Sequence, residues 1–428
     1  MGRFATLRNG CAEMTDVEAT LDRCIKCNTC MSYCPPARVT DLFPGPKYAG
    51  PQAQRFRVAR APSPDASVDY CNGCRVCNLV CPTGVRIAEL NARARAKLYE
   101  DRGGVPLRNR MLGRSELMGR LAHPVAPIAN WMLHNAVSRA AAEALLGVDR
   151  RAPLPRFSRQ TFVEWFRHRP ARPGPWRRRV AYFHGCATNY YEPWVGQAAV
   201  GVLERNGVEV TVPLQNCCAL PMLSNGEFGA ARRYYDSNLT KLGSTAEAGC
   251  EIVGTSTSCT LTLKEEAPEL LGVTSPAAER VASATNDLCE YLLRLYDAGE
   301  LDTGFQALPL MIVYHAPCQL NAHRIGHPAA DLMRLIPGLT VIESEQPCCG
   351  IGGTYGLKKE KYAIGMGVGQ PLFDRIKDSG VPLSVCDSET CRWQIVHGTG
   401  RPSVHPVQVL AWAYGIVEPP PYIRQASV

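Results

Sequence analysis

Two cysteine ladders near the N-terminus constrain this chain more than any other feature. Each ladder has three cysteines at every third position and a fourth one four residues later, directly before a proline. The ladders are Cys24, Cys27, Cys30 and Cys34 with Pro35, and Cys71, Cys74, Cys77 and Cys81 with Pro82. Thiolates at this spacing can surround an iron–sulfur cube. Zinc or disulfides would explain one ladder, but two complete ladders with both prolines favour two [4Fe–4S] clusters.

The fourth cysteine of each ladder is expected to bind the cluster of the other ladder, as in two-cluster bacterial ferredoxins. The first ligand set is then Cys24, Cys27, Cys30 and Cys81, and the second is Cys71, Cys74, Cys77 and Cys34. We assign residues 1–100 to a ferredoxin-type helical domain. Its last part, residues 87–99, is predicted to be a helix, because apolar residues recur there at helical spacing.

Composition places this domain in a larger cytoplasmic protein. The chain has 428 residues, enough for several domains, and 20 cysteines. Residues 1–10 contain Arg3 and Arg8 and no apolar segment typical of a secretory signal. We therefore expect reduced thiols that serve as metal ligands in the cytoplasm. Cys11 is interpreted as an incidental thiol, and Met1-Gly2 with Thr6 fits a permissive myristoylation pattern only formally.

Residues 101–179 read as a helical and basic linker. Ten arginines and one acid, Glu164, lie between Arg150 and Arg179, which gives a local charge of +9 against +8 for the whole chain. Such a stripe suits a membrane surface or an acidic protein partner. Nucleic acid is not expected as a partner, because no recognition fold accompanies the stripe.

Two segments of the linker each allow two interpretations. Residues 121–138 contain no Asp, Glu, Lys or Arg, but their prolines argue against a membrane-spanning helix. They form either a packed helix or a helix that lies on a membrane surface. Residues 158–169 predict a short helix with Phe162, Trp165 and Phe166 on one side, which is either interfacial or a strap whose aromatic rings fill a groove.

The second half of the chain contains an internal repeat. Its landmarks are one cysteine, an adjacent cysteine pair and a further cysteine, and they recur at offsets of 131 to 132 residues. The first copy has Cys186, Cys217, Cys218 and Cys259, and the second has Cys318, Cys348, Cys349 and Cys391. We assign copy 1 to residues 180–305 and copy 2 to residues 306–428.

Each copy alternates strand-like and helix-like segments, which predicts parallel α/β packing. The expected strands are residues 180–183, 208–212 and 252–255 in copy 1, and 311–314, 340–343 and 383–385 in copy 2. The landmark cysteines follow these strands, at the ends where open α/β sheets bind ligands. His184 and His315 lie two and three residues before the lone cysteines, and we expect them to hold equivalent positions. They are candidate proton donors or partners of cluster sulfur; hydrogen-bonded sheet histidines are the alternative.

The repeat resembles the cysteine-rich domain that occurs twice in the B subunit of heterodisulfide reductase. There the fullest pattern, Cys…Cys-Cys-Gly…Cys-x-x-Cys, holds a non-cubane [4Fe–4S] cluster. This chain departs from it, because Ser256 and Ser388 replace a cysteine and Ala219 replaces the glycine of copy 1. Serine binds iron poorly, although Cys386 could substitute near Ser388. Non-cubane clusters, other four-thiolate clusters, zinc or an empty site therefore remain open. Cys250 and Cys289 are interpreted as ordinary buried thiols.

The order of the domains resembles the iron–sulfur C subunit of anaerobic glycerol-3-phosphate dehydrogenase. Phrases outside the ladders carry this resemblance over roughly residues 20–415: Cys24-Ile-Lys-Cys27, Pro44-Gly-Pro-Lys47, Ala49-Gly-Pro51, Leu117-Met-Gly119, Ala126-Pro-Ile128, Phe183-His-Gly-Cys186, Cys348-Cys-Gly-Ile351, Thr354-Tyr-Gly356 and Glu389-Thr-Cys-Arg-Trp-Gln394. The ladders and the repeat also resemble the iron–sulfur subunits of glycolate oxidase and of lactate utilisation.

The resemblance implies an electron-transfer subunit on the inner face of the cell membrane. Flavoprotein partners would oxidise glycerol 3-phosphate, and this subunit would pass the electrons to quinone. The chain lacks a dinucleotide fingerprint, so we do not expect it to oxidise a substrate alone. The alternatives are a subunit of a glycolate or lactate oxidase, a thiol–disulfide reductase subunit similar to heterodisulfide reductase, and a C-terminal half that is a zinc-stabilised docking module.

Overall fold

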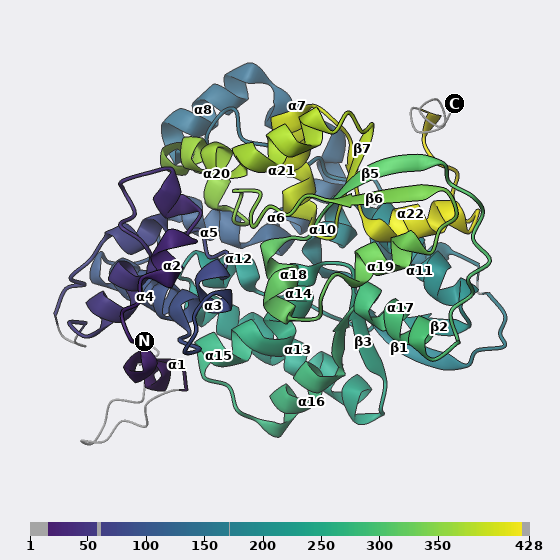
Figure 1. Ribbon diagram of the computed structural model, residues 1–428, viewed down its shortest axis with the longest axis horizontal. Coiled ribbons are helices and arrows are strands. Elements are labelled where there is room, and N and C mark those ends of the chain that lie inside the picture. The colour runs from purple at the N-terminus through teal and green to yellow at the C-terminus, as the bar shows by residue number, and fades with distance from the viewer. Residues whose placement is uncertain (1–15, 58–60, 171, 422–428) are drawn as a thin grey trace.

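A computed structural model describes residues 16–57, 61–170 and 172–421 (Figure 1). The predicted features at Cys11 and at Met1-Gly2 with Thr6 lie outside these residues. The N-terminal module, residues 16–101, lies at one side of the molecule, and copies 1 and 2 of the repeat form the other side (Figure 1). The mixed helical and parallel-sheet architecture that the sequence predicts is confirmed.

The N-terminal module is built from short helical turns around its cysteines. Asn28 and Arg75 have φ values of 69° and 62° directly before α2 and α3, so the chain reverses inside each ladder. The predicted helix after Pro82 is confirmed as α4. The elements are α1 (Asp16–Ala19), η1 (Thr20–Arg23), α2 (Thr29–Ser32), η2 (Pro36–Arg38), η3 (Tyr48–Gln52), η4 (Ser67–Tyr70), α3 (Val76–Leu79) and α4 (Ile87–Asp101).

The linker is helical, and its last helix is a strap. Thr161 and Glu164 form a capping box that starts α9, and the α9 residue Phe162 is buried against Tyr182 of copy 1, in a core that both copies share. Trp165 and Phe166 pack against the same core, which supports the strap over the interfacial helix. The elements are α5 (Leu107–Gly113), α6 (Ser115–Ala122), η5 (His123–Val125), α7 (Ala126–His134), α8 (Ala136–Leu146) and α9 (Phe162–His168).

Copy 1 contains a four-stranded parallel sheet in the order β2-β1-β3-β4. The sequence predicts three of these strands and misses β4, which has only three residues. The elements are β1 (Arg178–Phe183), α10 (Gly185–Tyr190), α11 (Pro193–Arg205), β2 (Val208–Thr211), α12 (Leu220–Ser224), α13 (Phe228–Glu247), β3 (Glu251–Gly254), α14 (Thr257–Leu261), η6 (Thr262–Glu266), α15 (Ala267–Leu271), α16 (Pro276–Ala284), β4 (Thr285–Asp287) and α17 (Leu288–Asp297).

Copy 2 repeats this topology in the order β6-β5-β7-β8, again fully parallel. The two-residue strand β8 is the one that the sequence analysis misses. The elements are β5 (Leu310–His315), α18 (Cys318–His323), α19 (Pro328–Arg334), β6 (Leu339–Glu343), η7 (Tyr355–Leu357), α20 (Lys359–Asp378), β7 (Leu383–Cys386), α21 (Glu389–Thr399), β8 (Ser403–Val404) and α22 (Pro406–Ala413).

The uncharged segment 121–138 does not form a packed helix. It continues from the end of α6 through α7 into α8, and several large apolar side chains along these helices face outward. The exposed ones are Leu121, Val125, Ile128, Trp131, Met132 and Val137, with Leu117 and Leu145 at the two ends. Within the described residues, no helix is both long and apolar enough to cross a membrane.

The arginine stripe is partly neutralised inside the fold. Five of its members pair with acids of the linker or of copy 1: Arg150 with Glu143, Arg151 with Asp149, Arg169 with Glu204, Arg178 with Glu300 and Arg179 with Glu209. Arg156, Arg159, Arg167 and Arg172 are exposed. The free positive charge of the stripe is therefore smaller than its sequence suggests.

Candidate iron–sulfur sites

The structure brings together the four cysteines of the first predicted set. Cys24, Cys27, Cys30 and Cys81 line one small cavity with Lys26 and Lys47 at its edge. Burial raises the pKa of Cys30 to about 11, and the neighbouring thiols of Cys81, Cys24 and Cys27 add to this shift. Among the cysteines that the structure describes, Cys27 alone is exposed. The first set therefore lies at the surface.

The second set is buried. Cys34, Cys71, Cys74 and Cys77 are between 6% and 9% exposed. Burial raises the pKa of Cys34 to about 12, and the nearby Cys71 contributes to the rise. Burial likewise raises the pKa of Cys77, and Cys71 and Cys34 add to the rise. The cross-over of Cys34 and Cys81 between the ladders thus agrees with the expected grouping.

The second set directly adjoins copy 2. A hydrogen bond with Cys348 and burial together raise the pKa of Cys74. The Cys348 sulfur also accepts a hydrogen bond from Asn72 Nδ2 at 3.6 Å. A thiol of the N-terminal module and a thiol of the repeat therefore touch, although they are far apart in the sequence.

Copy 2 gathers its landmark cysteines at the carboxyl end of its sheet. Cys349 Sγ lies 3.0 Å from Cys391 Sγ. Hydrogen bonds from Cys349 and Cys386 lower the pKa of Cys391, and hydrogen bonds from Cys318 and Cys74 lower that of Cys348. Two thiols of this group are thus poised to be thiolates, which are the forms that bind metal.

Copy 1 gathers the equivalent residues in the same way. Cys217 Sγ lies 3.8 Å from Cys186 Sγ, and hydrogen bonds from Cys186 and Cys218 lower the pKa of Cys217. Hydrogen bonds with Cys217 and Cys259 raise the pKa of Cys218. The backbone N–H of Cys217 donates to Glu116 Oε2 of α6 at 2.7 Å, so the linker also supports this group.

Three cysteine groups face one central cavity of about 120 Å³. The cavity lies where the N-terminal module and the two copies meet. Its cysteine lining is Cys71, Cys74, Cys186, Cys218, Cys259, Cys318, Cys348, Cys349 and Cys391. All 19 described cysteines are free of disulfides, so the thiols are available as ligands.

The two candidate histidines are not equivalent in space. The repeat offset of 132 aligns β1 with β5, so His315 is the last residue of β5 while His184 lies one residue beyond β1. His315 is buried, its Nδ1 contacts Ser344 Oγ at 3.1 Å, and it helps to lower the pKa of Cys391. His184 instead packs against Phe162, and burial lowers its pKa to about 4.

The two serines that replace cysteines have different surroundings. Ser256 Oγ donates to Glu389 Oε1 of copy 2 at 3.3 Å, whereas Ser388 Oγ contacts Thr390 Oγ1 at 3.4 Å. Cys386 is fully buried and forms a hydrogen bond with Cys391, so a thiol does lie near Ser388. Of the two other cysteines, Cys250 is only half-buried, while Cys289 is fully buried.

Charged residues that the sequence analysis missed hold the N-terminal module against both copies. Arg75 is 3% exposed, pairs with Glu89 and contacts Glu265 of copy 1 at 3.1 Å. Lys361 of copy 2 is 1% exposed and pairs with Asp69 at 2.9 Å. The only sequence signal was the position of Arg75 and Asp69 inside or beside the second ladder.

Comparisons with known proteins agree with this geometry. Residues 20–85 match the 4Fe-4S dicluster domain, and residues 180–264 and 312–396 each match the cysteine-rich domain. The chain is 36% identical to the C subunit of anaerobic glycerol-3-phosphate dehydrogenase from Escherichia coli (strain K12), over 92% of this chain and 99% of that protein. The chain belongs to the family of these C subunits.

More distant relatives share the same modules. The glycolate oxidase iron–sulfur subunit of Escherichia coli (strain K12) is 28% identical over 81% of this chain and 83% of that protein. The B subunit of fumarate reductase (CoM/CoB) from Methanothermobacter marburgensis is 25% identical over 90% of this chain and 70% of that protein. This C-subunit homologue is thus an iron–sulfur electron-transfer component of an oxidoreductase.

The donor sets fit the cofactor that the dicluster domain implies. Each predicted set of the N-terminal module offers four disulfide-free thiols, which is the complement of one [4Fe–4S] cluster. Such clusters supply one-electron transfer, and buried thiols with raised pKa values need the iron to become thiolates. The chain therefore carries iron–sulfur clusters in its dicluster domain.

Proposed function

We propose that this subunit carries electrons from a flavoprotein that oxidises glycerol 3-phosphate to the membrane quinone pool. The contact between Cys74 and Cys348 carries the proposal, because it joins the second ladder site to the repeat. In space the order is the exposed first site, the buried second site and copy 2, with copy 1 across the shared cavity. This order gives electrons a continuous path between the surface and the cavity.

The test uses the whole chain, purified anaerobically with its flavoprotein partners. Glycerol 3-phosphate should reduce clusters detectable by EPR, and a soluble quinone should reoxidise them. Cys24→Ser should remove one [4Fe–4S] signal and Cys71→Ser another. The relay is refuted if glycerol 3-phosphate with the flavoprotein leaves every cluster oxidised while dithionite reduces them.

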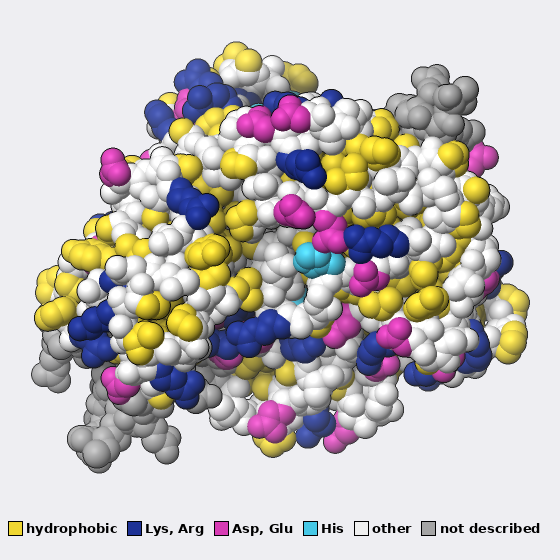
Figure 2. Space-filling model, in the orientation of Figure 1, with side chains coloured by type: hydrophobic (Ala, Val, Ile, Leu, Met, Phe, Trp, Pro, Cys, Tyr) yellow, Lys and Arg dark blue, Asp and Glu magenta, His cyan; other side chains and the backbone are white. Residues whose placement is uncertain are grey.

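The flavoprotein is proposed to dock where the first site reaches the surface. Ile25, Tyr33 and Tyr48 near this site are 65%, 53% and 51% exposed, and the exposed Lys26 lies at the same cavity. Figure 2 shows hydrophobic side chains together with lysine and arginine side chains over the N-terminal module. Apolar side chains with a basic rim suit a partner with an acidic rim.

Charge reversal at this face provides a specific test. Lys26→Glu should slow reduction by the flavoprotein, chiefly at low salt, and leave reduction by dithionite unchanged. Arg233→Glu is the matched control, because Arg233 is exposed on α13 of copy 1. Equal rates for Lys26→Glu and the control would contradict docking at this face.

The membrane is proposed to bind the outward side of α6 to α8. The exposed fractions of Leu121, Ile128, Trp131, Val137 and Leu145 are 64%, 63%, 65%, 78% and 83%, an unusually apolar surface for helices in water. Exposed apolar side chains along a helical surface are typical of interfacial helices. Ile128→Ser with Trp131→Ser should abolish co-sedimentation with anionic vesicles, whereas Leu214→Ser, also exposed but in copy 1, should not. Unchanged co-sedimentation of the double variant would contradict this surface.

A second candidate function is thiol–disulfide reduction at the central cavity. The observation that favours it is that cysteines from both copies line the same cavity. A disulfide substrate added to the reduced protein should then change the EPR signal of the C-terminal half and be consumed in proportion to the electrons stored. No disulfide consumption by the fully reduced protein would dismiss this candidate and leave the relay intact.

A further inference from the structure

The two copies meet through residues that are related by the repeat. In copy 1, Tyr182 Oη lies 2.8 Å from Thr255 Oγ1, and in copy 2 Tyr314 Oη donates to Asp387 Oδ2 at 2.7 Å. The repeat offset of 132 residues relates Tyr182 to Tyr314 and Thr255 to Asp387. The position that Thr255 holds in copy 1 is therefore held by an acid, Asp387, in copy 2.

The other copy places a helix-capping residue against each of these positions. His405, the N-cap of α22, contacts the Thr255 carbonyl through Nε2 at 2.8 Å. Asp287, the N-cap of α17, occupies the corresponding place on the other side and faces Asp387. The junction of His405 with Thr255 is a simple hydrogen bond. Its counterpart, the acidic junction, brings the carboxylates of Asp287 and Asp387 together.

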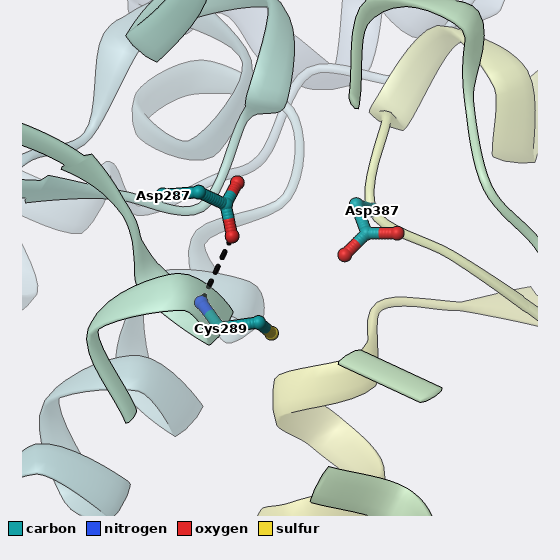
Figure 3. A group of neighbouring side chains, drawn as sticks. All are labelled: Asp287, Cys289 and Asp387. Atoms are coloured by element: carbon teal, nitrogen blue, oxygen red, sulfur yellow. Dashed lines mark hydrogen bonds between the residues drawn. The ribbon is translucent and has the colours of Figure 1, made fainter. Parts of the chain in front are cut away.

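Cys289 completes the group at the acidic junction (Figure 3). One ligand atom each of Asp287, Cys289 and Asp387 lies within 4.8 Å of the other two. The three residues are 2%, 0% and 1% exposed. In Figure 3 the carboxylates of Asp287 and Asp387 approach from opposite sides, and one oxygen of Asp387 points toward the other two residues.

Arg392 and His315 act on Asp387 only through space, because among the described residues Arg392 donates to the Cys386 carbonyl and Glu192, and His315 contacts Ser344. Asp387 Oδ2 accepts from Tyr314, but Asp387 Oδ1 is buried without a hydrogen-bond partner among the described residues. Asp287 accepts from the Cys289 N–H at 2.9 Å, and Figure 3 marks no hydrogen bond between the two carboxylates.

Burial makes the uncompensated charge unfavourable. Asp287 and Asp387 are 2% and 1% exposed, so both carboxylates are withdrawn from water. Buried charges in proteins are paired or coordinate a metal ion. The gap between the three donors is where a cation would compensate both carboxylates at once.

We propose that Asp287, Cys289 and Asp387 bind one zinc ion that ties copy 1 to copy 2. One thiolate and two carboxylates match the donors of zinc, whereas calcium and magnesium take oxygen donors alone. Three protein ligands leave the fourth position of a tetrahedral site for water. The site is separate from the cysteines of the central cavity, since none of its three residues lines that cavity.

The test measures zinc and iron in the full-length chain purified anaerobically from zinc-supplemented cells. The parent should hold zinc with one sulfur and oxygen neighbours in its zinc-edge X-ray absorption spectrum. Cys289→Ala and Asp387→Asn should each lower the zinc affinity by at least about tenfold and leave the iron content unchanged. Cys250→Ala, which removes a cysteine outside the group, should retain both metals.

Two results would overturn the proposal. One is a parent without zinc, or with a purely sulfur-bound zinc, which would place the metal among the landmark cysteines instead. The other is full zinc retention in either variant. If a variant loses iron as well, two measurements on the parent protein replace it. One is the zinc-edge absorption spectrum; the other is the melting temperature, which should rise when zinc chloride is restored after chelation.

Discussion

Gly350→Ala should destabilise copy 2 strongly, because two penalties coincide there. Gly350 follows the cysteine pair with φ of 88°, and a Cβ at this position would overlap the carbonyl oxygen of Gly365 in α20. The left-handed backbone alone costs a non-glycine residue about 1–2 kcal/mol. Moving α20 away adds the cost of overpacking, about 1–3 kcal/mol. The sum is roughly 2–5 kcal/mol.

The chain offers two controls that separate these penalties. Gly353 has φ of 62° and open space around its Cβ direction, so Gly353→Ala should cost only the backbone share, about 1–2 kcal/mol. Ala219 holds the equivalent position of copy 1 with φ of 76°, so copy 1 accommodates an alanine in this turn. Ala219→Gly should therefore stay within about 1 kcal/mol of the parent.

Thermal unfolding and hydrogen exchange of the cluster-loaded protein provide the assay. At about 3 °C per kcal/mol for a domain of this size, Gly350→Ala should lower the melting temperature of copy 2 by roughly 10 °C. Exchange should accelerate in α20 and remain unchanged in α13. If Gly350→Ala lowers the melting temperature no more than Gly353→Ala does, α20 does not contact this turn and the reasoning is wrong.

Three further predictions concern the contacts between modules. Burial raises the pKa of Glu266 to about 7 from its usual 4.5, so the native state binds a proton on this carboxyl more tightly than the unfolded state. The free energy of unfolding should therefore fall as pH rises from 4.5 to 7, and Glu266→Gln should flatten that dependence in denaturation measured at several pH values. Lys361→Met should cost about 1–3 kcal/mol by pulse proteolysis, because Asp69 loses its hydrogen-bonded cation but keeps Arg95 at 3.9 Å and the Tyr99 hydroxyl; Lys361→Met with Asp69→Asn should cost less than the sum of the two single changes. Phe162→Ala should cost about 3–5 kcal/mol in thermal unfolding, whereas Trp194→Ala, at a half-exposed position, should stay within about 1 kcal/mol.

Local patterns predicted the parts of the fold that local physics determines. The ladders have a fixed cysteine spacing, and the helix from Ile87 is amphipathic, so both could be recognised without neighbours. The short strands β4 and β8 carry too few residues for an alternating pattern and owe their pairing to the sheet beside them. The equivalence expected for His184 and His315 was wrong because strand register, rather than distance from the cysteine, sets their positions.

Tertiary contacts decided what the sequence left open. Phe162 could have faced a membrane or a core, and only the groove of copy 1 distinguishes the two. The apolar residues from Leu121 to Val137 are exposed because no described element covers them, which composition could not reveal. Arg75, Lys361 and Asp387 carry no motif of their own, since their partners come from other modules.

The burial of the second ladder site has a consequence for the order of assembly in the cell. Cys74 lies against Cys348, and both thiols are almost inaccessible once the N-terminal module has docked. The [4Fe–4S] cluster at this site must therefore be inserted before docking, while the ladder is still open. Cluster supply then limits the maturation of the whole chain: a molecule that closes too early is expected to be trapped without its second cluster, and reopening its buried ion pairs becomes the slow step of repair.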